Sequence, residues 1–204
     1  MSGILVFFIE PTKGFRRWLR RYQSGDCSVS GQRFHNARFK LDDARSDVLQ
    51  TFRDLKSAMA FDARWPTHCS CGYEFGDNGA CQLFVERIYR RTDTGEEMTL
   101  REAPAGACWN AYWVADGLKA PTFNLGDDGR CLVVKTPGGE WVIDSRASNC
   151  TLPDDSVHKC WVRHGRPEDG SLHVDKNGLT CGAGAGSIQC GDYHGFLHNG
   201  YLVP

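Results

Sequence analysis

Ten cysteines among 204 residues constrain this sequence more than any other feature. The apolar run at residues 4–9 is too short for a signal peptide, lacks a basic start and is followed by Glu10-Pro11. No later segment has the length of a membrane span. We therefore expect no membrane association and a reducing compartment, in which cysteines act as metal ligands or buried thiols. A secreted, disulfide-bonded protein is the alternative.

The stretch from Trp65 to Phe75 has the composition of a metal-binding turn. Pro66 favours an extended approach, and Gly72 can adopt the positive φ that a tight turn between two cysteines requires. Zinc takes about four nitrogen or sulfur ligands, usually from two short clusters that the fold brings together. Cys69 and Cys71 form one such cluster, so the sequence predicts a zinc site here.

The second half of this site is predicted to be Cys27 and His35. The two residues bracket a loop that precedes a predicted helix, and they would return to the first cluster if that helix folds back. The predicted zinc ligands are therefore Cys27, His35, Cys69 and Cys71.

Two other residues compete for ligand positions. His68 is adjacent to Cys69 and would need an awkward geometry to bind the same ion. Cys81 begins a predicted strand, and a free cysteine is a common core residue. The alternative to a metal site is that all these cysteines are ordinary buried thiols.

The apolar pattern predicts an α+β fold that is rich in β-strands. Residues 4–9, bounded by Gly3 and Pro11, predict a first strand. Between residues 41 and 59, apolar side chains recur at steps of three and four. This spacing predicts one main amphipathic helix in the N-terminal third, with acidic residues near its start.

The pattern changes after Cys81 to short antiparallel strands. Hairpins are predicted over 81–100 and 130–144, and further turns at Asn177-Gly178 and Asn199-Gly200. We expect a single domain over residues 1–204. In it, a zinc-knuckle-type clasp would hold a helix-containing part, residues 1–80, to a β-rich part, residues 81–204.

The run from Phe15 to Tyr22 combines aromatic and basic residues. Its aromatic residues and Leu19 fall at helical spacing, which favours an amphipathic turn with its arginines in solvent. The alternative is a nucleic-acid contact, which the net charge of −1 does not support. The arginines that would make it are Arg16, Arg17, Arg20 and Arg21.

A second group of cysteines and histidines lies in the last third of the chain. Pairs with three intervening residues suit a shared metal ion. Several arrangements fit, so the spacing singles out none of them. The candidates are Cys150, His158, Cys160, His164, Cys181, Cys190 and His194.

Two stretches, Cys108-Trp109 and the run from Trp141 to Asp144, resemble the cysteine and aspartate parts of transglutaminase-like thiol enzymes. Such an enzyme needs a histidine between these parts to generate the thiolate. This chain has no histidine between His68 and His158. The sequence therefore favours binding over catalysis, and a cysteine- or zinc-dependent hydrolase or transferase is the alternative.

Several stretches resemble uncharacterised proteins that bacteriophages of actinobacteria encode. The ending of the chain, from Ser187 to Gly200, also resembles a small zinc-associated family of unknown function. The resemblance implies a viral origin and zinc, but no established activity. Its segments are residues 141–150, 158–165, 183–188 and 193–197, together with Cys69-Ser70-Cys71-Gly72.

Together these features predict a zinc-stabilised phage accessory protein that binds a host or viral macromolecule. The expected partner is a protein, and the expected location is the host cytoplasm. A minor structural component of the virion is the alternative.

Overall fold

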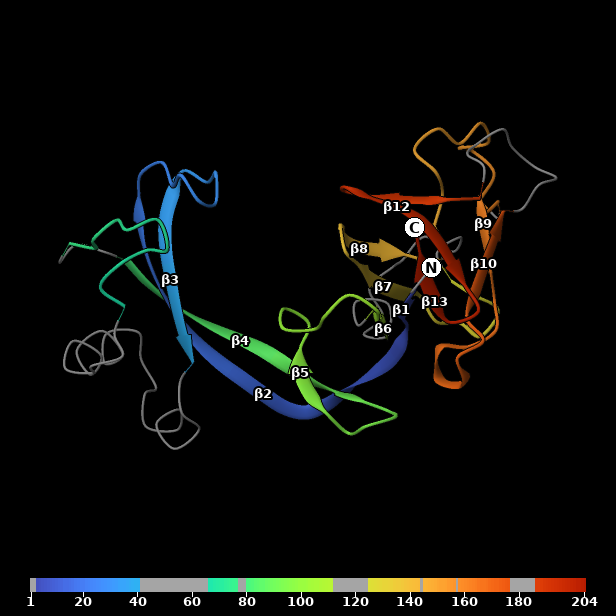
Figure 1. The fold of residues 1–204 in the computed structure, drawn as a ribbon, viewed down its shortest axis with the longest axis horizontal. Helices are drawn as coiled ribbons and strands as arrows, with labels where there is room; N and C mark the ends of the chain where they lie inside the picture. The colour runs from blue at the N-terminus through green and yellow to red at the C-terminus, as the bar shows by residue number, and fades with distance from the viewer. Residues whose placement is uncertain are drawn as a thin grey trace. The chain divides into compact units, whose positions relative to one another are not determined.

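The computed structural model describes residues 3–40, 66–76, 80–111, 125–143, 145–156, 158–176 and 186–204 (Figure 1). The chain divides into two compact units. The inserted unit is Thr12–Ile88, and the main unit comprises Met1–Pro11 and Tyr89–Pro204.

The described residues form thirteen β-strands, one short 3-10 helix and no α-helix. Within these residues, no helix is long and apolar enough to cross a membrane. In chain order the elements are β1 (Ile4–Leu5), β2 (Phe7–Ser24), β3 (Phe34–Lys40), β4 (Ala80–Arg91), β5 (Glu97–Thr99), β6 (Ala107–Asn110), β7 (Leu132–Thr136), β8 (Gly139–Val142), β9 (Trp161–His164), η2 (Pro167–Asp169), β10 (His173–Lys176), β11 (Ile188–Cys190), β12 (Tyr193–His198) and β13 (Tyr201–Val203).

The predicted β-rich character and the antiparallel hairpins are confirmed, but the prediction of one main helix is wrong. The described residues of the N-terminal third form strands and loops and contain no α-helix. The stretch 41–59, where the sequence predicts that helix, lies outside the described residues.

The run from Phe15 to Tyr22 shows why helical spacing misleads in this chain. It belongs to β2, which pairs with β3 in an antiparallel ladder. Side chains of a strand alternate between two faces, so Leu19 and Arg21 point to the same side, and both are buried. The expectation that all the arginines stay in solvent is therefore wrong for Arg21.

Three hairpins form where the sequence predicts turns. β4 and β5 are neighbours in one sheet, and β7 pairs with β8 from Val133 to Thr136. β12 pairs with β13 across Asn199-Gly200, where both residues have positive φ, as a tight two-residue hairpin turn requires. The predicted turn at Asn177-Gly178 lies outside the described residues.

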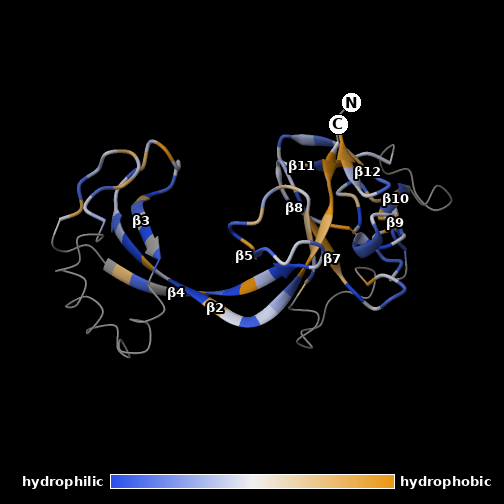
Figure 2. Ribbon diagram, turned by 60° about the horizontal axis from the view of Figure 1, so that its bottom comes forward, coloured by the Kyte–Doolittle hydropathy of each residue, from blue (hydrophilic) through white to orange (hydrophobic). Residues whose placement is uncertain are grey.

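The main unit is built around a sheet that is buried on both faces. The start of β2 pairs in parallel with β6, and β6 pairs with β7. Phe8, Cys108 and Val134 belong to one apolar cluster, whereas Phe7 and Trp109 belong to another. Burial on both faces explains why the first three residues of β7 are all apolar rather than alternating, and Figure 2 shows this part in orange.

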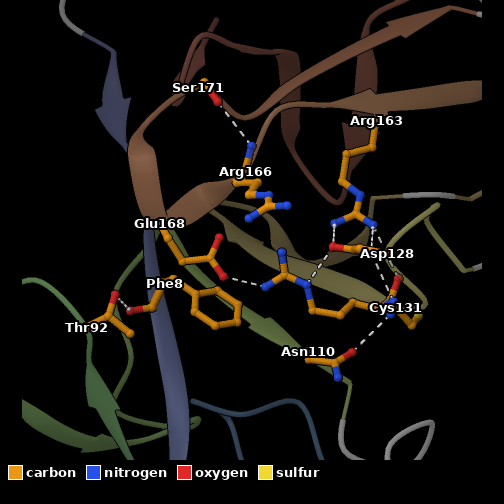
Figure 3. Close-up of polar contacts among 10 residues, drawn as sticks. Phe8, Thr92, Asn110, Asp128, Cys131, Arg163, Arg166, Glu168 and Ser171 are labelled. Atoms are coloured by element: carbon orange, nitrogen blue, oxygen red, sulfur yellow. Dashed lines mark hydrogen bonds and ion pairs between the residues drawn. The ribbon is translucent and has the colours of Figure 1, made fainter.

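A network of charged side chains joins three segments of the main unit (Figure 3). Arg163 of β9 donates hydrogen bonds to both carboxylate oxygens of Asp128. Arg130 donates to the same carboxylate at 2.6 Å and also to Glu168 of η2. Burial alone would raise the pKa of Asp128, but these two guanidinium groups hold it well below its usual range.

We predict that Asp128→Asn lowers the free energy of unfolding by about 1 kcal/mol at pH 7, because the partly exposed carboxylate loses two charged partners. The folded-state pKa lies below the unfolded one, so this contribution is present above about pH 4 and is lost as the pH falls further. Urea denaturation at pH 7 and near pH 2.5 measures it. Asp127→Asn is the control, and a difference that does not shrink at low pH would contradict the prediction.

Candidate metal centre

Four side chains from distant parts of the sequence converge in the inserted unit. The ligand atoms of Cys27, His35, Cys69 and Cys71 all lie within 4.8 Å of one another. Cys27 Sγ and Cys69 Sγ are 3.8 Å apart, and His35 Nδ1 lies 3.2 Å from Cys71 Sγ. With Zn–S bonds of about 2.3 Å, two thiolates on one tetrahedral zinc are about 3.8 Å apart. The cluster could therefore hold a metal ion.

These are the four residues that the sequence predicts as ligands. The three cysteines are free thiols, and the sulfur separation far exceeds a disulfide bond of about 2.05 Å. All four residues belong to Thr12–Ile88. The identity of the metal, and its predicted role in joining residues 1–80 to residues 81–204, stay predictions.

Cys69 and Cys71 lie in a short hairpin with a tight turn. The Cys69 amide donates to the Tyr73 carbonyl at 2.8 Å, and the Gly72 amide donates back to the Cys69 carbonyl at 2.9 Å. Gly72 has φ +88°, the positive value that was expected for a tight turn between the two cysteines. The Phe75 amide donates to the Thr67 carbonyl, and this hydrogen bond closes the hairpin. We call residues 67–75 the knuckle.

Cys27 lies in the turn that connects β2 and β3. Its amide donates to the Gln32 carbonyl and its carbonyl accepts from the Gly31 amide, both at 2.9 Å. Gly31 has φ +65°, so a glycine suits the turn. The turn therefore presents the Cys27 sulfur from a backbone that is fixed by its own hydrogen bonds.

His35 is held in place by contacts on its ring faces and edge. It lies in β3 opposite Gln23. Its ring stacks on Tyr73 with a centroid distance of 3.8 Å and an interplanar angle of 1°. A Cβ at Gly25 would lie 2.8 Å from His35 Nε2, so glycine at this position leaves room for the ring. This packing directs Nδ1 towards the Cys71 sulfur.

Backbone amides favour the thiolate form of two of the cysteines. The Ser30 hydroxyl, followed by the Ser30 amide, lowers the pKa of Cys27 to about 6. Burial works against the thiolate of Cys69, but amide hydrogen bonds from Cys71 and Asn36 keep its pKa below the usual value. Thiolates are the form in which cysteine binds metals.

Cys71 behaves differently. The Tyr73 amide favours its thiolate, but burial and the neighbouring sulfurs of Cys69 and Cys27 raise its pKa. Three negative sulfurs at this spacing repel one another, and a bound cation would remove that repulsion.

The ligands themselves form much of the apolar core around the site. In the described part of the inserted unit, one buried cluster consists of Cys27, Cys69 and Phe75. Ala37, Cys71 and Tyr73 pack against it. Three buried side chains contribute little apolar surface, so a metal ion bound among them would add to the stability of this part of the unit.

Arg21 fixes both ends of the knuckle, a role that the sequence reasoning missed. Its guanidinium donates to the carbonyls of Pro66 at 2.9 Å, Phe75 at 3.2 Å and Gly76 at 2.9 Å. Arg21 is only 8% exposed, and its guanidinium carbon lies 5.2 Å from the centre of the Phe75 ring. The period-two spacing from buried Leu19 is the signal that could have identified it as inward-facing.

The competing ligands lie apart from this cluster. His68 is exposed, and its Nδ1 is 2.8 Å from the Thr67 hydroxyl. Cys81 is buried in β4 and is not one of the residues whose ligand atoms converge.

The second predicted group is only partly brought together. Among the described residues, Cys150, His158 and Cys160 form a cluster within 4.8 Å that could hold a metal ion. Three other candidates lie elsewhere. His164 contacts Asp175, Cys190 contacts the Glu140 carbonyl and His194 contacts Ser187, while Cys181 lies outside the described residues.

Cys108 lacks the properties of a catalytic thiol. Its side chain is 0% exposed, and it pairs with Val134 in the sheet of the main unit. Burial raises the pKa of this thiol far above its usual value, so the thiolate that a nucleophile requires does not form near neutral pH. Asp144, the other part of that resemblance, lies outside the described residues.

Comparisons with known proteins gave no match to a family model, a curated protein or a solved structure. The resemblance to phage proteins therefore stays a prediction.

We predict that Arg21→Met lowers the free energy of unfolding of the inserted unit by about 2–4 kcal/mol, because three carbonyls lose their donor while the side-chain volume is kept. Zinc affinity should fall as well, because the knuckle is no longer held. Urea denaturation and competition with a chelating dye measure the two effects. Arg33→Met, at an exposed position of the same unit, should change stability by less than about 0.5 kcal/mol. Equal effects of the two substitutions would refute the role of Arg21.

Proposed function

We propose that this chain is a zinc-stabilised binding protein rather than an enzyme. The observation that carries the proposal is the convergence of Cys27, His35, Cys69 and Cys71 within 4.8 Å. Four protein ligands complete a tetrahedron and are typical of structural zinc, whereas catalytic zinc keeps one position for water. Three sulfurs and one imidazole favour zinc over harder cations.

The proposed zinc holds the knuckle against the β2–β3 hairpin. Cys27 and His35 belong to the hairpin, and Cys69 and Cys71 belong to the knuckle. Because the described apolar cluster here is so small, the free energy of metal binding becomes free energy of folding. The zinc is thus a scaffold for whatever surface the inserted unit presents.

The distribution of charge supports an acidic protein surface as the partner. Residues 12–88 contain thirteen Lys and Arg against nine Asp and Glu, whereas the rest of the chain contains eleven against sixteen. The near-zero total charge therefore conceals a basic inserted unit. Arg33 beside the Cys27 turn and Lys40 in β3 are exposed. Opposite charge at such a surface speeds association and orients the partner.

The resemblance of the sequence to phage proteins supports a host or viral partner in an infected bacterial cytoplasm. A minor virion component and a hydrolase or transferase are the other functions that the sequence left open. The buried Cys108 disfavours a thiol enzyme, and the four-ligand set of Cys27, His35, Cys69 and Cys71 disfavours catalysis at that cluster.

Removal of the zinc ligands should unfold the inserted unit selectively. In Cys69→Ser/Cys71→Ser, we expect the loss of about one zinc per chain and of several kcal/mol of stability, because metal binding and folding are coupled. Hydrogen exchange should become faster in peptides from 12–40 and 66–88 and stay unchanged in peptides from 125–143. Metal analysis and exchange mass spectrometry measure these effects.

Cys190→Ser is the matched control, since Cys190 is a half-buried thiol outside both clusters. It should retain the wild-type metal content and exchange pattern. A double variant that keeps its zinc, or a wild-type chain that stays fully protected in chelator, would overturn the structural zinc.

The partner prediction is tested by reversing charge on the inserted unit. The tagged full chain should capture an acidic protein from an extract of phage-infected host cells. Arg33→Glu/Lys40→Glu should reduce this capture by about tenfold, because two attractive charges become repulsive. Arg166→Glu, at an exposed position of the main unit, should leave it unchanged. If nuclease treatment abolishes the capture and charge reversal does not, the partner is a nucleic acid rather than a protein.

A further inference from the structure

We propose that Cys150, His158 and Cys160 form a second metal site, in the main unit and independent of the first. Their ligand atoms lie within 4.8 Å of one another. His158 Nε2 is 3.5 Å from Cys160 Sγ. Nitrogen and sulfur ligands of one tetrahedral zinc are separated by about 3.5 Å, given bonds of about 2.0 and 2.3 Å. The spacing in the main unit therefore matches that of a shared zinc ion.

The surroundings of His158 provide independent support. The residue is only 3% exposed, and its Nδ1 has no hydrogen-bond partner among the described residues. Its Nε2 lies 3.5 Å from the Cys160 sulfur, which is a weak hydrogen-bond partner. An imidazole buried in this way is costly unless a nitrogen is satisfied. A metal ion bound at Nε2 would replace this weak contact with a strong one on the side of the ring that faces Cys160.

The loop that carries these ligands is fixed without regular secondary structure. Arg146 donates to the carbonyls of Pro153 at 2.6 Å and His158 at 3.0 Å, and also to that of Asp155. One guanidinium therefore binds carbonyls from three positions of the loop and holds them close together. Such a loop places its side chains reproducibly, which a metal site needs.

Cys150 shares one feature with Cys69 of the first site, a backbone amide two residues further on that contacts its sulfur. Its own amide donates to the Ala147 carbonyl at 3.1 Å, which closes a tight turn. The amide of Leu152, two residues further on, lies 3.4 Å from the Cys150 sulfur. In the first site, the Cys71 amide bonds to the Cys69 sulfur at the same sequence offset. Amide donors of this kind stabilise a thiolate ligand.

The chemistry of the donors identifies the class of ion. Two sulfurs and one imidazole suit zinc or a similar thiophilic cation and disfavour magnesium or calcium, which prefer oxygen. Cys160 also packs in the core of the main unit beside Trp161. A metal here would attach the loop of residues 145–160 to that core.

Native mass spectrometry of the full chain, purified with zinc, tests the proposal by counting ions. The wild type should carry two zinc ions. Cys150→Ser/Cys160→Ser should carry one, and Cys27→Ser/Cys69→Ser should also carry one. The second site would be overturned if the wild type carries one zinc ion, Cys150→Ser/Cys160→Ser keeps it and Cys27→Ser/Cys69→Ser loses it. That result would leave the site of Cys27, His35, Cys69 and Cys71 intact. A wild-type mass lower by two hydrogens, with Cys150 and Cys160 joined as a disulfide, would also overturn it.

Alkylation of the wild type keeps the test valid even if a variant misfolds. Cys150 and Cys190 are both half-buried thiols of the main unit, but only Cys150 belongs to the cluster. We expect iodoacetamide to label Cys150 about tenfold faster after zinc removal, because a metal-bound thiolate is protected. Labelling of Cys190 should not change. Equal labelling of Cys150 with and without chelator would refute the site.

Discussion

The convergence of three sulfurs and one imidazole is the constraint on which the inserted unit depends. Around these atoms, the described apolar cluster consists largely of the ligand cysteines and the rings beside them. A buried group of thiols contributes little hydrophobic stabilisation and creates repulsion once the thiols ionise. A metal ion bound by these four groups would remove that repulsion and add the free energy of coordination to the free energy of folding. The hairpin turns, the stacked ring of His35 and the glycine beside it all hold the ligand atoms in place.

Beside each of the two cysteine and histidine clusters, an arginine donates to several backbone carbonyls. Arg21 binds carbonyls at both ends of the knuckle, and Arg146 binds carbonyls around the loop of residues 145–160. In both places the chain has little or no regular secondary structure, so its carbonyls need donors from elsewhere. The planar, five-donor guanidinium can satisfy several of them at once. The two clusters therefore share a physical device although their ligands and turns differ.

The two units differ in how they are stabilised and in what they offer a partner. The main unit has large apolar clusters on both faces of a sheet, and it buries Cys108 so completely that this thiol cannot serve as a nucleophile. The inserted unit has the metal cluster and an excess of basic residues. The proposed binding function uses this difference, because the inserted unit carries both the candidate metal cluster and the excess of positive charge.

The sequence by itself was enough to predict the hairpins, the β-rich class and which four residues come together in the first cluster. Turn chemistry is local, so Gly72 and Asn199-Gly200 specify their own positive φ values, and the apolar run of β7 identifies a buried strand. Only the tertiary structure decided the rest. Helical and strand periodicities overlap in the run from Phe15 to Tyr22, and pairing with β3 resolves them in favour of a strand. Contacts between segments far apart in the chain decide which of the seven downstream cysteines and histidines converge. Such contacts also bury Arg21, and no local pattern encodes them.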